Sequence, residues 1–441
     1  MDFAPHTEAE VAEMLAAVGR PSLEALFDQI PPAVRLGRPL DLPTGVSEPE
    51  IVAELAGLAA RNRSADDLVC FAGAGAYDHY VPAAVWALAG RSEFYTSYTP
   101  YQPELSQGVL QALFEFQSMV CELTGLDVSN ASLYDGPTAL AEAVNLARGA
   151  EDRDRVLVSS AVDRRYVETL RAYGHGAGYV TEVFEARDGR GGAPEVGADV
   201  AAVVVQHPNA YGVLEPVADL FDAAHAGGAR AIQVFDPLSL GVLAPPGELG
   251  ADIAVGEGQS LGNHLNYGGP YLGLIAAREA HLRRMPGRIV GETLDVDGRT
   301  GYVLTLQARE QHIRRDKATS NICSNQTLMA IAATVYLAWL GPAGLAELGR
   351  ACAAKASYAA ERLAGVPGIS LLYPGAPFFK EFAIVLPRDA GEVRDALVER
   401  GFLAGVPLPD AGGRALLVAV TERRSRAEID ALADAMAEVL A

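Results

Sequence analysis

The stretch VAAVVVQHPNAYGVLEPVADLFDAAHAGGARAIQVFDPLSLG, residues 200–241, contains the pattern that decides the fold class. An apolar run from Val200 is followed by a helical segment, PVADLFDAAHAGG, and then by a second apolar run from Ala231. Continuous apolar runs are typical of strands buried on both faces, and helices between them connect parallel neighbours. The stretch therefore predicts one unit of a parallel α/β sheet.

The same alternation extends from about residue 150 to 310. Seven β-rich runs begin at Val156, Tyr179, Val200, Ala231, Asp252, Tyr271 and Gly301. The last two runs lie close together in the sequence, which allows an antiparallel edge there. We therefore predict a mostly parallel, seven-stranded sheet that is covered by helices on both faces.

The flanking regions predict two further parts. Residues 1–65 contain helical segments, the first with Thr7 as its cap and the third from Glu48 to Ala60. A long helical region from Arg309 to Ala364 is followed by the strand-like runs ISLLYP, EFAIVLP and ALLVAV, which alternate with helices. We predict an N-terminal helical arm over 1–65, a large domain over 66–310, and a connecting helix with a small C-terminal α/β domain over 311–441.

Composition excludes several classes of function. The formal net charge is −21, from 35 basic and 56 acidic residues, so nucleic acid is not an expected partner. No uninterrupted apolar run approaches the roughly 20 residues of a membrane helix, and the acidic start lacks the plan of a signal peptide. We expect no membrane partner and a cytoplasmic location.

The numbers and positions of the cysteines and lysines bear on two kinds of chemistry, metal binding and Schiff-base formation. Four scattered cysteines show no zinc-ligand spacing, so no metal is expected. Lys317, Lys355 and Lys380 are the only lysines, and arginine cannot replace a lysine that forms a Schiff base. Lys317 is the one lysine that we consider for an approach to an active site, and its arginine neighbours favour a basic contact segment instead.

Two segments combine aromatic and polar residues. FAGAGAYDHYVP, residues 71–82, is a Gly-rich turn followed by His79 and Tyr80, and it lacks the GxGxxG pattern of dinucleotide binding. FYTSYTPYQPELSQG, residues 94–108, places three tyrosines in one short segment with two prolines. Such a segment forms either a pocket wall or a surface loop that packs on a neighbouring helix.

Two further segments have alternative interpretations. NASLYDGPTALAEA, residues 130–143, precedes a helix start, which is a natural anion site. Asp135 and Pro137 instead favour a helix cap there. Asp236 follows an apolar run, where its carboxylate either pairs with a protonated pyridine nitrogen or forms an Asp-Pro turn.

Together these segments resemble the glycine cleavage system P-protein, specifically the alpha chain (subunit 1) of its two-chain form. The resemblance runs in order along nearly the whole chain, through FAGAGAYDHYVP, YTPYQPELSQG, NASLYDGPTALAEA, FDPLSLG, QSLGNHLNYGGPYLG and REQHIRRDKATSNIC. It implies the fold-type-I architecture of pyridoxal-phosphate-dependent transferases.

The resemblance also implies an activity and partners. The enzyme would be glycine dehydrogenase (aminomethyl-transferring), an alpha2-beta2 assembly in which the beta chain carries pyridoxal phosphate on a lysine. Glycine would lose its carboxylate as carbon dioxide, and the aminomethyl group would pass to the lipoyl arm of the H-protein. The alpha chain would bind no cofactor covalently and would not be active alone.

The resemblance places the beta chain's cofactor lysine at about Gln259, counted back from Gly268-Gly269-Pro270, and glutamine cannot form that bond. This chain would then have no catalytic residue of its own, and Asp236 would be a vestige of the cofactor site. As residues that contact the partner subunit or substrate we predict His79, Tyr80, Tyr95, Tyr98, Tyr101, Gln102, Thr319, Ser320 and Asn321. A cofactor-free scaffold and an autonomous enzyme of the same fold are the alternatives.

Overall fold

The computed structural model describes residues 5–149 and 153–441, and the chain divides into two units, Met1–Asn62 and Arg63–Ala441. The first four residues, which belong to the start interpreted above as lacking a signal peptide, lie outside the described residues.

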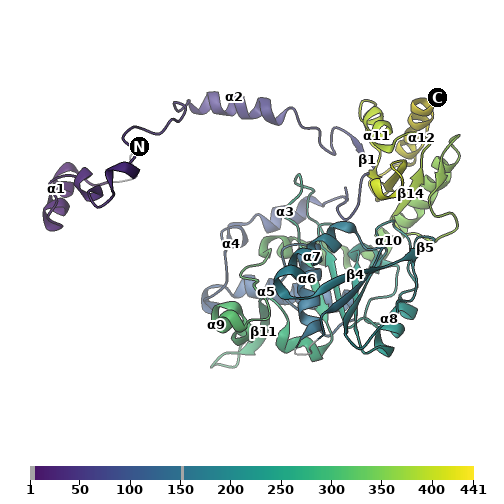
Figure 1. The fold of residues 1–441 in the computed structure, drawn as a ribbon, viewed down its shortest axis with the longest axis horizontal. Coiled ribbons are helices and arrows are strands. Elements are labelled where there is room, and N and C mark those ends of the chain that lie inside the picture. Colours follow the sequence, from purple (N-terminus) through teal and green to yellow (C-terminus); the bar gives the residue numbers. More distant parts are fainter. Residues whose placement is uncertain (1–4, 150–152) are drawn as a thin grey trace. The chain divides into compact units, whose positions relative to one another are not determined.

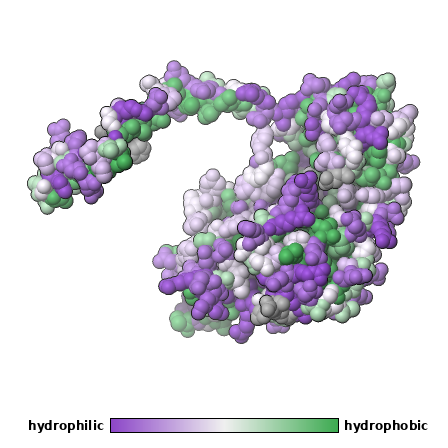
Figure 2. Space-filling model, in the orientation of Figure 1, coloured by the Kyte–Doolittle hydropathy of each residue, from purple (hydrophilic) through white to green (hydrophobic). Residues whose placement is uncertain are grey.

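The N-terminal unit consists of short helices without a buried helical core. The elements are α1 (Glu8–Ala17), η1 (Glu24–Phe27), η2 (Pro32–Val34) and α2 (Glu48–Ala59). Thr7 forms the predicted cap, since its Oγ1 accepts from the backbone N–H of Glu10 at 3.4 Å and its own backbone N–H donates to Glu10 Oε2 at 2.7 Å. Neither α1 nor α2 has a buried residue. Ile51, Leu55 and Leu58 form an exposed apolar stripe at helical spacing, and Figure 2 shows apolar residues along one side of α2.

The large sheet of the second unit has seven strands, as predicted. Their order is β2 (Val128–Ser129), β10 (Gly273–Ala277), β9 (Ile253–Glu257), β8 (Arg230–Phe235), β7 (Val200–His207), β3 (Arg155–Ser159) and β4 (Val180–Phe184). The strands from β9 to β4 are parallel, and β10 pairs antiparallel with both β9 and β2.

One of the seven predicted strands was wrong. The run from Gly301 forms β12 (Thr300–Thr305), which pairs with β11 (Ile289–Leu294) in a separate hairpin. The remaining strand of the sheet is β2, which has only two residues and therefore leaves no readable period in the sequence.

Helices cover both faces of this sheet (Figure 1). Successive side chains of β7 point to opposite faces, so Ala202 and Val204 belong to one core while Val203 and Val205 belong to another. The first core includes residues of α6 (Gly136–Arg148) and α7 (Arg164–Ala177), and the second includes residues of α8 (Val217–Ala226). A third core joins α5 (Gln107–Thr124) and α10 (Thr327–Ala364) to residues of β8, β9 and β10.

The C-terminal part has its own antiparallel sheet and core. The strand order is β13 (Ser370–Leu371), β14 (Glu381–Val385), β17 (Ala415–Ala419) and β16 (Val406–Leu408), covered by α11 (Ala390–Val398) and α12 (Arg426–Leu440). Early in the chain, β1 (Val69–Cys70) pairs in parallel with β15 (Phe402–Leu403). These two strands form a separate two-stranded sheet, so the segment after Cys70 starts beside the C-terminal part and then crosses to the large sheet.

The predicted long helix was too long at its start. Residues 309–326 form only η6 (Gln307–Arg309), α9 (Gln311–Arg314), η7 (Arg315–Lys317) and an irregular segment up to α10. Arg315 has a φ of 58°, which a continuous α-helix does not accommodate. A second break inside α10 lies at Gly341, with a φ of 61°, directly before Pro342.

Among the described residues, α10 is long and apolar enough to cross a membrane by length and composition, although the sequence contains no uninterrupted apolar run of that length. Half of its most apolar stretch is buried inside the molecule, as in core helices of soluble proteins. It packs against α3 (Ala83–Ala89) and α5. We therefore assign α10 to the protein core.

The remaining elements are short. They are α4 (Ser92–Tyr95), η3 (Pro103–Leu105), β5 (Ala186–Arg187), β6 (Arg190–Gly191), η4 (Pro237–Gly241), η5 (Glu279–Arg284) and η8 (Pro409–Ala411).

Candidate functional site

The loop after β9 contains the residue predicted to stand in place of a lysine. Gln259 is 1 % exposed. Its Oε1 accepts a hydrogen bond from the backbone N–H of Tyr77 at 2.9 Å, and its Nε2 donates to the backbone oxygens of Asn263 at 2.8 Å and Tyr77 at 3.2 Å. An amide can both accept and donate in this way, whereas the ammonium of a lysine has no acceptor. Gln259 therefore ties the loop after β9 to the Gly-rich segment 71–82.

Two carboxylates accept hydrogen bonds from the backbone amides at the start of α6. Asp135 Oδ1 accepts from Thr138 N at 2.8 Å, and Glu257 Oε2 accepts from Gly136 N at 3.0 Å. Burial raises the pKa of Glu257 to about 7. The structure confirms the helix-cap interpretation of this segment. Two acidic side chains lie where a phosphate would need free donors.

Asp236, at the end of β8, has two roles at once. Its Oδ1 accepts from Leu238 N at 3.1 Å, which is the turn interaction considered from the sequence. Its Oδ2 lies 2.8 Å from Nζ of Lys380. The carboxylate that a cofactor's ring nitrogen would need is thus paired with a lysine of the same chain.

Lys380 lies directly before β14 and is 1 % exposed. Its Nζ is 3.1 Å from His79 Nε2 and 3.5 Å from the centroid of the Tyr77 ring. The cavity left beside Lys380 and Asp236 measures about 40 Å³, which is room for a water molecule or two. A drug-sized ligand needs a cavity of roughly 300 Å³ or more.

Lys380, and not Lys317, is the lysine that lies beside Asp236. Lys317 is exposed in η7, whereas Lys380 reaches Asp236. The ion pair joins two residues that are far apart in the sequence, so no local sequence pattern predicts it. The rarity of lysine was the one available signal.

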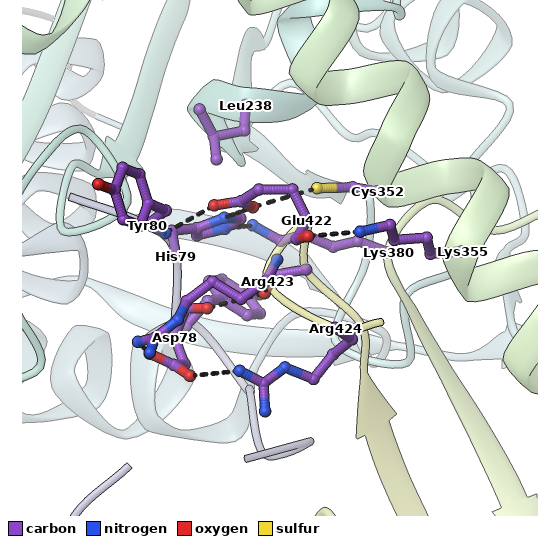
Figure 3. Close-up of polar contacts among 12 residues, drawn as sticks. Asp78, His79, Tyr80, Leu238, Cys352, Lys355, Lys380, Glu422, Arg423 and Arg424 are labelled. Atoms are coloured by element: carbon purple, nitrogen blue, oxygen red, sulfur yellow. Dashed lines mark hydrogen bonds and ion pairs between the residues drawn. The ribbon is translucent and has the colours of Figure 1, made fainter. Parts of the chain in front are cut away.

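His79 connects Lys380 to Glu422 (Figure 3). Because the Lys380 ammonium can only donate, His79 Nε2 is the acceptor, and the ring proton lies on Nδ1. Nδ1 donates to Glu422 Oε2 at 2.6 Å. Burial and the charge of Lys380 lower the pKa of His79. The ring is therefore neutral at neutral pH and relays a hydrogen bond between two charged groups.

The same cluster contains a group of potential metal ligands. Atoms of His79, Cys352 and Glu422 lie within 4.8 Å of one another. Both ring nitrogens of His79 are engaged, and burial raises the pKa of Cys352 to about 12, so its thiol stays protonated. These features favour a hydrogen-bonded cluster over a metal site.

A second set of hydrogen bonds joins the Gly-rich segment 71–82 to the C-terminal part of the chain. Asp78 accepts from Arg424 Nη2 at 3.1 Å and from Arg423, and all three lie beside the loop after β17 (Figure 3). Glu381 accepts from Ala74 N at 2.6 Å and from the Tyr77 hydroxyl at 2.8 Å. The Gly-rich segment is thus held between the large sheet and the small sheet.

The predicted contact residues do not form one site. Tyr80, Tyr95, Tyr98 and Tyr101 are each more than half exposed, and Gln102 is exposed beside them in sequence. Arg288 Nη2 donates to the Tyr101 hydroxyl at 3.2 Å. Tyr95 is the last residue of α4. Figure 1 shows α4 on the same side of the unit as α9 and β11, opposite β5 and α8.

The segment 319–321 lines a different cavity. Thr319, Ser320 and Asn321 border a hollow of about 640 Å³ together with Tyr134 and Glu142. Burial raises the pKa of Glu142 to about 7. His79, in contrast, is buried inside the Lys380 cluster.

The raised pKa of Glu257 predicts a pH-dependent stability. The unfolded carboxyl titrates near pH 4.3 and the folded one near 7. The folded state keeps a proton that the unfolded state has released, so this contribution is complete below about pH 4 and is lost as the pH rises through 7. We expect Glu257→Gln to gain about 3 kcal/mol relative to wild type between pH 4.5 and 8. Urea unfolding of both chains across this range measures the difference, and a constant difference would refute the assignment.

The architecture defines the class of protein. The chain has the fold of type I pyridoxal-phosphate enzymes, as shown by a sphingosine-1-phosphate lyase of Burkholderia pseudomallei. That structure matches with a TM-score of 0.66 and 18 % identity over 93 % of this chain and 94 % of its own. A glutamate decarboxylase of Lactobacillus brevis matches with a TM-score of 0.67 and 13 % identity, over 93 % and 96 %.

The chain belongs to the glycine cleavage system P-protein family, whose model matches residues 1–436. It is 54 % identical to a "probable glycine dehydrogenase (decarboxylating) subunit 1" of Moorella thermoacetica and 51 % identical to the protein of that name in Carboxydothermus hydrogenoformans, with at least 99 % of each chain covered. The crystal structure of a glycine decarboxylase (P-protein) in inhibitor-bound form matches with a TM-score of 0.93 and 50 % identity, over 100 % of both chains.

Proposed function

We propose that this chain is subunit 1 of a glycine-decarboxylating enzyme, that it holds no cofactor, and that it completes an active site that belongs to a second subunit. The family and the names of its relatives support the activity. One observation carries the division of labour: the residues at the expected cofactor site do not suit pyridoxal phosphate. Gln259 stands where a cofactor lysine would be expected. The carboxylates of Glu257 and Asp135 accept hydrogen bonds from the amides at the start of α6, and the ammonium of Lys380 pairs with Asp236.

The cofactor chemistry then belongs to the second subunit, in an alpha2-beta2 assembly that acts on glycine and delivers the aminomethyl group to the lipoylated H-protein. Pyridoxal phosphate supplies the electron sink for the carbanion there. The subunit-1 names of the relatives support a heteromeric complex. We also propose a cytoplasmic location and the three-part division at 1–65, 66–310 and 311–441.

The exposed tyrosines are the part of this chain best suited to contact the second subunit. Tyr95 and Tyr98 are 68 % and 76 % exposed, and each ring offers an apolar face and a polar hydroxyl. Thr319, Ser320 and Asn321 line an open polar cavity on the same unit. We assign these residues to positioning by preorganisation and His79 to the internal cluster.

Replacing Tyr95 and Tyr98 together with alanine is expected to lower kcat/KM of the reconstituted enzyme at least about tenfold. The subunits should still assemble, because the change removes rings without burying a charge. Steady-state decarboxylation and analytical size exclusion measure both quantities. Trp339→Ala is the matched control, since Trp339 is 58 % exposed on α10, and it should keep full activity.

The alternative is a scaffold without any contribution to the active site. It predicts that the double variant assembles and turns over at the wild-type rate. That result would refute the positioning role while leaving the family membership untouched.

A further inference from the structure

The ammonium of Lys380 is fully satisfied by three partners. An ammonium has three N–H donors. They meet Asp236 Oδ2 at 2.8 Å, His79 Nε2 at 3.1 Å and the face of the Tyr77 ring at 3.5 Å from its centroid. Lys380 is therefore a bound cation and not a nucleophile, since a nucleophilic amine needs a free lone pair.

The Lys380 ammonium lies where a ligand would be expected in this fold. Asp236 stands at the carboxyl end of a central strand, where open α/β sheets bind ligands. In a cofactor-bearing relative of this fold, a carboxylate there would pair with a protonated pyridine nitrogen. We propose that Lys380 is a built-in substitute for that ring: its ammonium neutralises Asp236 and holds the small domain closed against the large sheet.

The backbone around Lys380 supports a closed arrangement. The Lys380 backbone oxygen accepts from Val420 N at 2.9 Å, which ties it to the small sheet. Its neighbour Glu381 accepts from Ala74 and Tyr77 of the Gly-rich segment. An added Cβ at Gly212 would lie 1.9 Å from the Glu381 backbone oxygen. The loop after β7 therefore meets the first residue of β14 at backbone contact beside Lys380, and the cavity of about 40 Å³ next to Asp236 is too small for a cofactor ring with its phosphate.

The electrostatics require a cation at this place. Asp236 is mostly buried, with 13 % of its side chain exposed, and Lys380 supplies the opposite charge. Glu381, which is also buried, accepts from the Tyr77 hydroxyl at 2.8 Å. Removing the ammonium would leave Asp236 without a countercharge in a poorly solvated site, which is costly.

The test begins with Lys380→Met in the full-length chain, since methionine keeps the apolar stem and removes the charge. We expect the Tm to fall by about 5 °C. Lys380→Met combined with Asp236→Asn should recover most of that loss, because the uncompensated charge is then gone. A wild-type Tm for Lys380→Met, or an additive double variant, would overturn the proposal.

Chemical rescue supplies a readout that mere packing would not move. Lys380→Ala removes the atoms of one n-propylammonium ion, so n-propylammonium should raise the Tm of this variant in a saturable manner. Neither 1-propanol nor the Lys380→Ala, Asp236→Asn double variant with n-propylammonium should show the effect. Equal rescue by 1-propanol would assign Lys380 a packing role only and would overturn the electrostatic substitution.

The proposal rests on the absence of a cofactor from this chain, which is part of the function proposed above, but the two fail separately. The rescue experiment uses neither glycine nor pyridoxal phosphate. A wild-type chain that formed a borohydride-stable adduct with pyridoxal phosphate would refute the cofactor-free role and also the substitution by Lys380. Loss of rescue alone would refute only the substitution.

Discussion

Replacing Asp78 with alanine is expected to lower the free energy of unfolding by about 3–5 kcal/mol. Asp78 is 6 % exposed and Arg424 is 4 % exposed, with Arg424 Nη2 3.1 Å from Asp78 Oδ2. Arg423 donates to the other carboxylate oxygen. The variant leaves the buried Arg424 guanidinium without its closest carboxylate, because Glu428 Oε1 is 3.9 Å away. Urea unfolding at pH 7 measures the loss.

Asp66→Ala is the matched control for this prediction. Asp66 pairs with the same Arg423 at 3.8 Å, but its side chain is 90 % exposed. An exposed ion pair contributes about 0–1 kcal/mol, so this variant should be nearly as stable as wild type. Equal losses in the two variants would contradict the account, because burial would then have no effect.

Replacing Gln259 with lysine is expected to destabilise the chain by about 2–4 kcal/mol without creating a cofactor site. The lysine cannot accept from Tyr77 N, and it brings an ammonium into a position that is 1 % exposed. In this variant the Lys380 ammonium still pairs with the Asp236 carboxylate, and Glu257 still accepts a hydrogen bond from the first amide of α6. A restored amine alone therefore does not restore the site.

Two measurements check this second prediction. Urea unfolding gives the stability loss, with Gln259→Met as the control that removes the hydrogen bonds without adding a charge. Incubation with pyridoxal phosphate and borohydride, followed by mass spectrometry, detects any covalent adduct at position 259. A stoichiometric adduct on the new lysine would show that only the amine was missing, contrary to the filled site described here.

Much of the fold was readable from the sequence because it rests on local patterns. The run from Val200 to Gln206 is buried on both faces, as its continuous apolar composition predicts. The cap at Thr7 and the cap at Asp135 form as their residue types indicate. Gln259 lies buried in the loop after β9.

Other features depended on contacts between distant parts of the chain. The two-residue strand β2 is defined only by its partner β10. His79 is buried whereas its neighbour Tyr80 is exposed, and this difference likewise depends on packing. Periodicity reports which face of an element is apolar, but not which neighbour covers it.

By itself, the sequence determined the parallel α/β architecture and the absence of a lysine in the loop after β9, because both are properties of short contiguous segments. Only the tertiary structure decided that Lys380 is the cation at Asp236. The two charges lie far apart in the sequence, so their pairing depends on where the folded chain brings them. Desolvation of the site, which no local pattern encodes, makes that pairing important for stability.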